Sequence, residues 1–366
     1  STLRDQGLTG YGLLDFARQS WILLAEAVSR YGLDVRLASW LLGLPVFART
    51  APGRMAAFGT ASAAISTVLS NTATAALMTP IALGALGEKG EGRPRRADSG
   101  LLLMIAYGAS IGGMATLIGT PPNLLVAGFL ERLAGVRVTF TGWLAFALPI
   151  AVALLLVSLA LTRLTLGRDV GGELSPLDAR RDARGDGEDA GENRAGARWT
   201  VAAFSLAFAL WLAPSLAQGV LGREHPVAAT LGKHFPEAGV ALLCATLLFL
   251  APVSWRKRRF ALSWADGQRV NWGVLMLFGG GLSLGTLGES TGIARWAGEG
   301  VVSSGLAASP ESFMFLCVIA AITVSEFASN TASATLLVPI VIAAARQAGF
   351  DPVPPALAAG LAATCG

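Results

Sequence analysis

The sequence predicts an all-α polytopic membrane protein with inverted structural repeats, each containing a re-entrant helical hairpin and a broken helix. Three observations predict this fold. Hydrophobic residues make up 53% of the 366 residues and charged residues only 14%, whereas a soluble globular chain carries about 25% charged residues. Apolar stretches of membrane-spanning length recur along the chain. Residues 70–81 read SNTATAALMTPI and residues 329–340 read SNTASATLLVPI, so the chain also contains an internal repeat.

Several apolar segments approach the roughly 20 residues that a helix needs to cross the hydrocarbon core. They are residues 11–30, 101–130, 141–162, 199–217, 238–253, 271–288 and 355–366. Two further segments, 55–86 and 311–345, are each interrupted by a Ser-Asn-Thr triplet and carry a proline beyond it. Because irregular backbone at membrane depth occurs only inside protein or beside a cavity, we predict a re-entrant hairpin in each.

Basic clusters at residues 30–54, 89–96 and 256–259 indicate the cytoplasmic side. The first hairpin then enters from the cytoplasm and the second from the outside. The charged, glycine-containing segment 163–198 predicts a mobile cytoplasmic linker. It divides a first repeat (residues 1–162) from a second (199–366). An odd number of spans between the hairpins makes the repeat inverted, which marks the binding site of a secondary transporter.

Each Ser-Asn-Thr triplet lies where two half-helices meet. The free N–H groups of the following half-helix attract anions, and Ser and Thr hydroxyls can donate to a carboxylate. The free C=O groups of the preceding half-helix, with the Asn oxygen, suit a hard cation such as Na⁺. One triplet alone is also explained as a helix N-cap. Two triplets in matching contexts favour binding, with both breaks sharing one anion near the midplane.

A second motif, Gly-Thr-Pro-Pro-Asn at 119–123, interrupts the segment 101–130. The prolines break the helix and expose backbone carbonyls and another half-helix N-terminus. The preceding glycines, Gly108, Gly112 and Gly113, allow close helix approach. The alternative is a proline kink without a ligand.

The segments SNTATAALMTPIA, GASIGGMATLIGTPPN, NWGVLMLFGGGLSL and SEFASNTASATLLVPI together resemble the divalent anion–sodium symporter family, whose members carry dicarboxylates, citrate or sulfate. The resemblance extends from about residue 11 to the end. It implies an elevator-type carrier that couples Na⁺ to uptake of a small divalent anion and works as a homodimer in the lipid bilayer. Na⁺ is the coupling ion, and no other cofactor and no enzymatic activity are implied. Only three of the 28 basic residues are lysine, which points to a bacterial source and hence to the inner membrane.

The resemblance also implies site residues. One cation site is implied at Ser66, Ser70, Asn71 and Gly119, and a second near Ser325 and Asn330. Substrate carboxylates are implied to contact Ser70, Asn71, Thr72, Thr120, Ser329, Asn330 and Thr331.

The chain departs from the family at both ends. The sequence separation between Ser70 and Gly119, counted on from Ser329, reaches position 378, which lies beyond Gly366. At the other end, the family's first spans would precede residue 11. We therefore expect an incomplete carrier that lacks one wall of the second cation site and does not transport as given.

The predicted site contains no Lys or Arg in residues 55–83, 101–130 or 311–345. Bound cations and helix dipoles then have to compensate a doubly charged anion at membrane depth, which favours symport over uniport. Glu326 lies four residues before Asn330, hence on the same helical face. It is either a cation or proton relay or, in the simpler interpretation, a charge near the outer mouth.

Other functions fit less well. The sequence does not separate a symporter from a dicarboxylate exchanger of the same architecture. It also does not decide which anion is carried or whether the coupling ion is Na⁺ or H⁺. A channel would repeat its filter around a pore. A membrane-embedded hydrolase is also disfavoured: its G-x-S-x-G match, Gly281–Gly285, lies in an apolar span without a histidine partner. The three cysteines have no metal-ligand spacing, and the basic loops reflect membrane topology, so we expect neither a transition metal nor a nucleic-acid partner.

Overall fold

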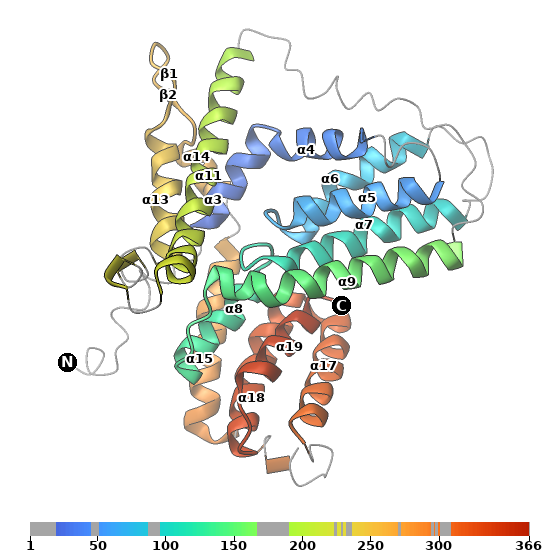
Figure 1. The fold of residues 1–366 in the computed structure, drawn as a ribbon, viewed down its shortest axis with the longest axis vertical. Coiled ribbons are helices and arrows are strands. Elements are labelled where there is room, and N and C mark those ends of the chain that lie inside the picture. Colours follow the sequence, from blue (N-terminus) through green and yellow to red (C-terminus); the bar gives the residue numbers. More distant parts are fainter. Residues whose placement is uncertain are drawn as a thin grey trace. The chain divides into compact units, whose positions relative to one another are not determined.

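The computed structural model describes residues 20–44, 51–86, 96–166, 190–222, 225–227, 230–231, 236–269, 272–293, 296, 299–300 and 309–365. Across these residues the fold is almost entirely helical (Figure 1). The chain divides into two compact units. Unit 1 comprises Ser1–Ala48, Pro80–Gly92 and Gly172–Asn271, and unit 2 comprises Arg49–Thr79, Arg93–Gly171 and Trp272–Gly366.

Unit 1 contains five described helices and a short hairpin. The helices are α3 (Trp21–Arg30), α4 (Leu33–Leu42), α11 (Ala190–Leu221), α13 (Glu237–Leu250) and α14 (Trp264–Arg269). Helices α3, α11 and α13 pack against one another. Of the predicted span 11–30, the part before residue 20 lies outside the described residues.

Two short strands, β1 (Pro252–Ser254) and β2 (Arg259–Phe260), pair antiparallel, and the other described elements are helices, in agreement with the predicted all-α class. Helix α13 ends at Leu250, and Ala251 is extended, with φ −73° and ψ 112°. The residue before a proline is disfavoured in the helical region, so Pro252 starts an extended segment. The turn at 255–258 then reverses the chain, with Arg258 at φ 50°.

The predicted linker 163–198 overlaps a helix at each of its ends. Helix α9 (Phe140–Leu166) and helix α11 extend into it, and only residues 167–189 lie outside the described part of the chain. Alanine favours the helix at the start of α11, and Ala197 is buried there. Glu192 in the first turn pairs with Lys257 and Arg259. Charge content alone therefore misplaced this boundary.

Unit 2 contains the helices that carry both Ser-Asn-Thr triplets. They are α5 (Ala51–Ser66), α6 (Asn71–Leu86, in unit 2 as far as Thr79), α7 (Arg96–Ala115), α8 (Pro121–Phe129), the π-helix η1 (Leu130–Ala134), α9, α15 (Trp272–Thr291), α17 (Pro310–Phe327), α18 (Asn330–Gln347) and α19 (Val353–Ala363).

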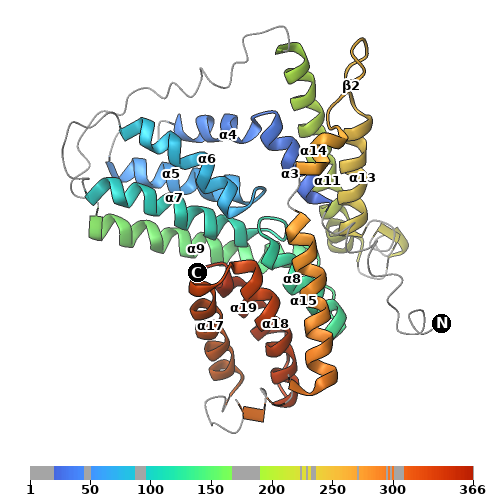
Figure 2. The same ribbon diagram turned by 180° about the vertical axis from the view of Figure 1, so that it is seen from behind.

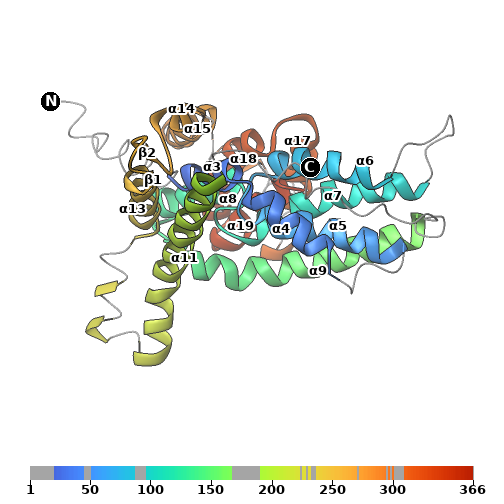
Figure 3. The same ribbon diagram turned by 90° about the horizontal axis from the view of Figure 1, so that it is seen from above.

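Helices α5, α7 and α9 pack side by side (Figure 3), and α17, α18 and α19 form a second group (Figure 2). Helix α8 contacts both α18 and α19. Glycines set the close approach of α7 to α5: a Cβ on Gly108 would overlap the Gly59 carbonyl, and one on Gly112 would overlap the Ala63 backbone.

Three described helical segments are long and apolar enough to cross a bilayer. They are Phe140–Thr165, Gly191–Leu221 and Pro310–Phe327, with mean hydropathies of 2.7, 1.7 and 1.5. Helix α9 is the most apolar and is mostly exposed, with Leu164 78% accessible. Such a surface is suited to lipid.

Candidate functional site

The first Ser-Asn-Thr triplet lies at a four-residue break, residues 67–70, between α5 and α6. We call it the first break. Leu69 N–H still donates to Ile65 O (3.0 Å), which closes the last turn of α5. Ser70 then caps α6: its Oγ accepts from Ala73 N–H (3.3 Å), and its carbonyl accepts from Thr74 N–H (2.9 Å). A new helix starts here because a Ser N-cap offers the helix start a side-chain acceptor.

A buried serine joins the two sides of the first break. Ser66 Oγ lies 3.1 Å from Asn71 Oδ1 and 3.4 Å from Leu69 O. A hydroxyl has one proton to donate, so two acceptor oxygens compete for it. Only one of these two oxygens can accept the Ser66 hydrogen bond, and the other is left without it.

Helix α7 and the connection after it bring one glycine each to the same place. A Cβ on Gly113 would overlap Asn71 Oδ1, and a Cβ on Gly119 would lie 2.9 Å from Ser66 O. Both positions therefore require glycine if the backbone is to approach the first break this closely. Ser66, Asn71 and Gly119, three members of the first predicted cation site, are neighbours in the structure.

The Gly-Thr-Pro-Pro-Asn motif forms the predicted break in 101–130, since residues 116–120 separate α7 from α8. Thr116 Oγ1 donates to Thr67 O (2.6 Å) and so ties this break to the first. Asn123 Nδ2 donates to Gly113 O (2.9 Å) and to Thr116 O (2.7 Å). Asn123 is fully buried, and its Oδ1 has no partner among the described residues. Thr120 is 4% exposed and occupies the N-cap of α8.

The second break, residues 328–329, separates α17 from α18. Ser329 caps α18 by accepting from Ala332 N–H (3.2 Å). Ser325 Oγ lies 3.2 Å from Asn330 Oδ1 and 2.6 Å from Ala363 O. Asn330 Nδ2 donates to Thr364 O (3.3 Å), which fixes its amide with the oxygen toward Ser325. The five-residue Ser–Asn spacing and the competition of two acceptors for one proton thus recur.

The two breaks do not share a described contact. Thr72 is exposed and Thr331 is half-buried, and neither side chain has a described hydrogen bond. The elements that hold the breaks meet through α8, where Gly360 of α19 packs against Val126. Binding of one anion by both triplets therefore stays a prediction.

The same-face argument for Glu326 is wrong. Helix α17 ends at Phe327 and α18 begins at Asn330, so helical periodicity does not carry across the break. Ser325 contacts Asn330, whereas Glu326 is exposed.

Sequence reasoning missed the carbonyls of Ala363 and Thr364 and the bridging role of Asn123. Backbone oxygens leave no signal in residue type. Asn123 did carry a signal, since an Asn three residues into a helix that follows a glycine-rich helix end is placed to reach back to free carbonyls.

No titratable side chain contacts either break among the described residues. Each break therefore presents neutral oxygen acceptors beside a helix N-terminus. Hard cations prefer oxygen ligands, and helix N-termini prefer anions. The arrangement can hold both in one place.

Residues 20–363 match the citrate transporter family CitMHS. The chain belongs to this family. The predicted resemblance to the divalent anion–sodium symporters is thereby confirmed. The sodium-dependent dicarboxylate transporter SdcS of Staphylococcus saprophyticus is 29% identical over 357 residues, which is 94% of this chain and 65% of the relative. SdcS of Staphylococcus aureus USA300 is 28% identical over 356 residues, with the same coverages of 94% and 65%. An uncharacterized transporter of Haemophilus influenzae is 32% identical over 317 residues, 83% of this chain and 60% of the relative.

The chain thus spans less than two thirds of the length of these curated relatives. Membership in the citrate transporter family, together with the apolar helices, makes it a multi-pass membrane protein and not an enzyme. The geometry around Ser283 agrees: it lies inside the continuous helix α15 and donates to Gly279 O (2.9 Å). A nucleophile elbow requires a strand–turn–helix instead. The described residues contain no group of three or more His, Cys, Asp or Glu side chains able to hold a metal.

Proposed function

We propose that the chain carries the binding core of a Na⁺-coupled carrier of a small divalent anion, a dicarboxylate such as succinate or malate, or citrate or sulfate. The observation that supports this proposal most directly is the repeated geometry of the two breaks. In each, a buried Ser hydroxyl lies 3.1 or 3.2 Å from the Oδ1 of an Asn five residues later. The name of the SdcS relatives, sodium-dependent dicarboxylate transporter, supports this direction.

The cation half of the proposal follows from proton counting. At each break one hydroxyl proton meets two acceptor oxygens, Leu69 O and Asn71 Oδ1 in the first and Ala363 O and Asn330 Oδ1 in the second. A Na⁺ ion satisfies the acceptor that the proton leaves. Ser66, Ser70, Asn71 and Gly119 form the proposed first cation site, and Ser325 and Asn330 belong to the second.

The anion half follows from the helix starts and from charge. Helices α6 and α18 begin at Asn71 and Asn330, so their free N–H groups and the Ser70 and Ser329 side chains are available to an anion. Thr72, Thr120 and Thr331 add hydroxyls. Because residues 55–83, 101–130 and 311–345 lack Lys and Arg, the bound cations supply the positive charge that the anion needs in a medium of low polarity.

An elevator mechanism is the proposed form of transport. Both breaks belong to unit 2, and unit 1 contains neither. The units are assembled from alternating segments of the chain, so unit 2 can carry the bound ions as one body while unit 1 stays in place. We extend the proposal to a homodimer in the bacterial inner membrane, with each protomer holding its own site.

Succinate binding to the purified protein tests the proposal. Isothermal titration with succinate is run in NaCl and in choline chloride. We expect saturable binding in NaCl, little binding in choline, and loss of both Na⁺ and succinate affinity in Asn71→Ala, because one residue serves both ions. Succinate affinity that is equal in the two salts would overturn the coupling.

A further inference from the structure

The β1–β2 hairpin of unit 1 carries a dense positive charge directly after an apolar helix. Helix α13 ends at Leu250, which is 65% exposed, and the hairpin extends beyond that end (Figure 1). Its turn and second strand contain four consecutive cations, Arg256–Arg259, all exposed. The candidate membrane span Gly191–Leu221 begins beside this hairpin, where Glu192 pairs with Lys257 and Arg259, and a basic cluster at the end of a membrane span lies at the depth of lipid headgroups.

Among the described residues, two of these four basic side chains have an ion-pair partner. Glu192 accepts from Lys257 Nζ and from Arg259 Nη1, both at 2.9 Å. The side chains of Arg256 and Arg258 have no partner among the described residues. Two guanidinium groups therefore face outward with their donors free.

Large aromatic side chains surround the basic turn. Trp255 is 76% exposed and Trp264 71% exposed. Trp199, 45% exposed, donates from Nε1 to Pro252 O (3.2 Å) and so lies beside the base of the hairpin. Exposed tryptophans are unfavourable in water and are enriched at the membrane interface, where one part of the ring is dry and the other wet.

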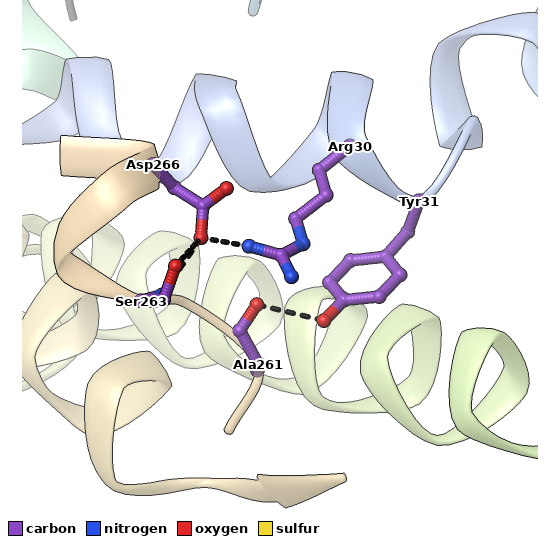
Figure 4. A network of polar contacts seen from close by, with 5 residues as sticks. All are labelled: Arg30, Tyr31, Ala261, Ser263 and Asp266. Atoms are coloured by element: carbon purple, nitrogen blue, oxygen red, sulfur yellow. Dashed lines mark hydrogen bonds and ion pairs between the residues drawn. The ribbon is translucent and has the colours of Figure 1, made fainter. Parts of the chain in front are cut away.

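The hairpin is fastened to helix α3 by a polar network (Figure 4). Asp266 is buried and pairs with Arg30, and Ser263 N–H donates to the same carboxylate oxygen (2.8 Å). Tyr31 OH donates to Ala261 O (2.7 Å), directly after β2. Gly196 of α11 leaves room for the Tyr31 ring, because a Cβ there would overlap it. The basic turn is therefore held at a defined position on unit 1.

We propose that the hairpin is a binding site for anionic phospholipids, with Arg256 and Arg258 contacting the headgroup phosphodiester and Trp255 and Trp264 in the acyl–headgroup boundary. The combination distinguishes this ligand from a soluble anion: free cations attract any phosphate, but exposed indoles and Leu250 require a neighbouring hydrocarbon phase. This inference is independent of the carrier function, since it uses none of the residues at the breaks.

Thermal unfolding of the full chain in detergent micelles tests it, with phosphatidylglycerol, phosphatidylcholine or inorganic phosphate added. We expect phosphatidylglycerol alone to raise the unfolding midpoint. Arg256→Gln/Arg258→Gln is expected to need roughly 30-fold more phosphatidylglycerol for half of the effect, as loss of two basic contacts predicts. Arg36→Gln/Arg163→Gln is the matched control, because it removes two exposed arginines whose side chains have no partner in the described part of the chain, and it is expected to titrate like the wild type.

Glu192→Gln sharpens the test in the opposite direction. It releases Lys257 and Arg259, so less phosphatidylglycerol is expected to give half of the effect. If the Arg256/Arg258 variant titrates like the wild type, if phosphatidylcholine acts equally, or if phosphate alone suffices, the proposal is overturned. Should that variant not fold, wild type in 1 M NaCl decides: the Debye length falls to about 3 Å, and an undiminished phosphatidylglycerol effect contradicts the proposal.

Discussion

The two breaks repeat one motif but differ in what completes it. At the first break, both oxygens near the Ser66 hydroxyl, Leu69 O and Asn71 Oδ1, come from the break and the first residue of α6. At the second break, the hydroxyl of Ser325 is closest to Ala363 O, at the end of α19 and 38 residues away in sequence. The first break is closed locally, whereas the second needs a separate helix.

The neighbouring helix also has a different role at each break. Helix α7 makes room for Asn71 through Gly113, because Asn71 Oδ1 occupies the space that a side chain at position 113 would take. Helix α19 instead offers carbonyls, and Thr364 O accepts from Asn330 Nδ2. The difference teaches that the first break is sensitive to steric change in its neighbour and the second to loss of hydrogen bonds.

The largest expected effect on ligand binding is steric. Gly113→Ala places a Cβ where Asn71 Oδ1 lies, so Asn71 must leave its position, and overpacking costs about 1–3 kcal/mol. We expect loss of Na⁺-dependent succinate binding in isothermal titration. Gly279→Ala is the control, since a Cβ there has nothing within 4 Å. Near-normal binding by Gly113→Ala would show that Asn71 is not needed in this position.

Asn123→Ala is expected to damage the first break alone. It leaves the buried Gly113 O and Thr116 O without their amide donor, and each unsatisfied buried group costs about 1–3 kcal/mol. The unfolding midpoint and the Na⁺ affinity should both fall. Asn123→Asp should lower the unfolding midpoint at least as much, because it places a buried oxygen in place of Nδ2 against the Gly113 and Thr116 carbonyls. Asn123→Asp and Asn123→Ala behaving like the wild type in both measurements would remove Asn123 from the site.

Removing the Ser66 or the Ser325 hydroxyl tests whether the first break is held by contacts within itself and the second by contacts to α19. Ser325→Ala leaves Ala363 O without its 2.6 Å donor, and we expect a loss of about 1–3 kcal/mol in the free energy of unfolding. Ser66→Ala should cost less, about 0.5–1.5 kcal/mol, because its hydrogen bonds are longer and both join residues within one short connection. Denaturant unfolding measures both, with exposed Ser290→Ala as the control. Equal losses would contradict the distinction between the breaks.

The sequence predicted the helix breaks because their residues act locally. Ser70 and Ser329 are N-caps, and Pro121 and Pro122 occupy the first two positions of α8. It did not predict the carbonyls of Ala363 and Thr364, because every residue has the same carbonyl and only tertiary packing selects one. The hairpin at 252–260 was missed because two strands of three and two residues are too short for a period-2 pattern.

Two sequence interpretations failed where a helix begins or ends. Glu326 was placed beside Asn330 by a periodicity that stops at Phe327. Residues 190–198 were assigned to a linker because they are charged, yet Glu192 finds its partners on the β1–β2 hairpin, 65 or more residues later. In both cases the deciding contact lies outside the sequence window that the interpretation used.

The smallest expected effects come from the helix caps, and they address the shared anion. Ser70→Ala and Ser329→Ala each remove one cap hydrogen bond, 3.3 and 3.2 Å long, so each should cost about 1 kcal/mol of stability and the matched glycine variants only a few tenths. In a double-mutant cycle the stability losses should add, because the caps have no described contact with each other. The losses in succinate affinity should not add if one anion bridges α6 and α18, since the first substitution already breaks the bridge. Additive losses in affinity would mean that the two breaks bind separate ions, and the repeated geometry would then describe two sites and not the two halves of one.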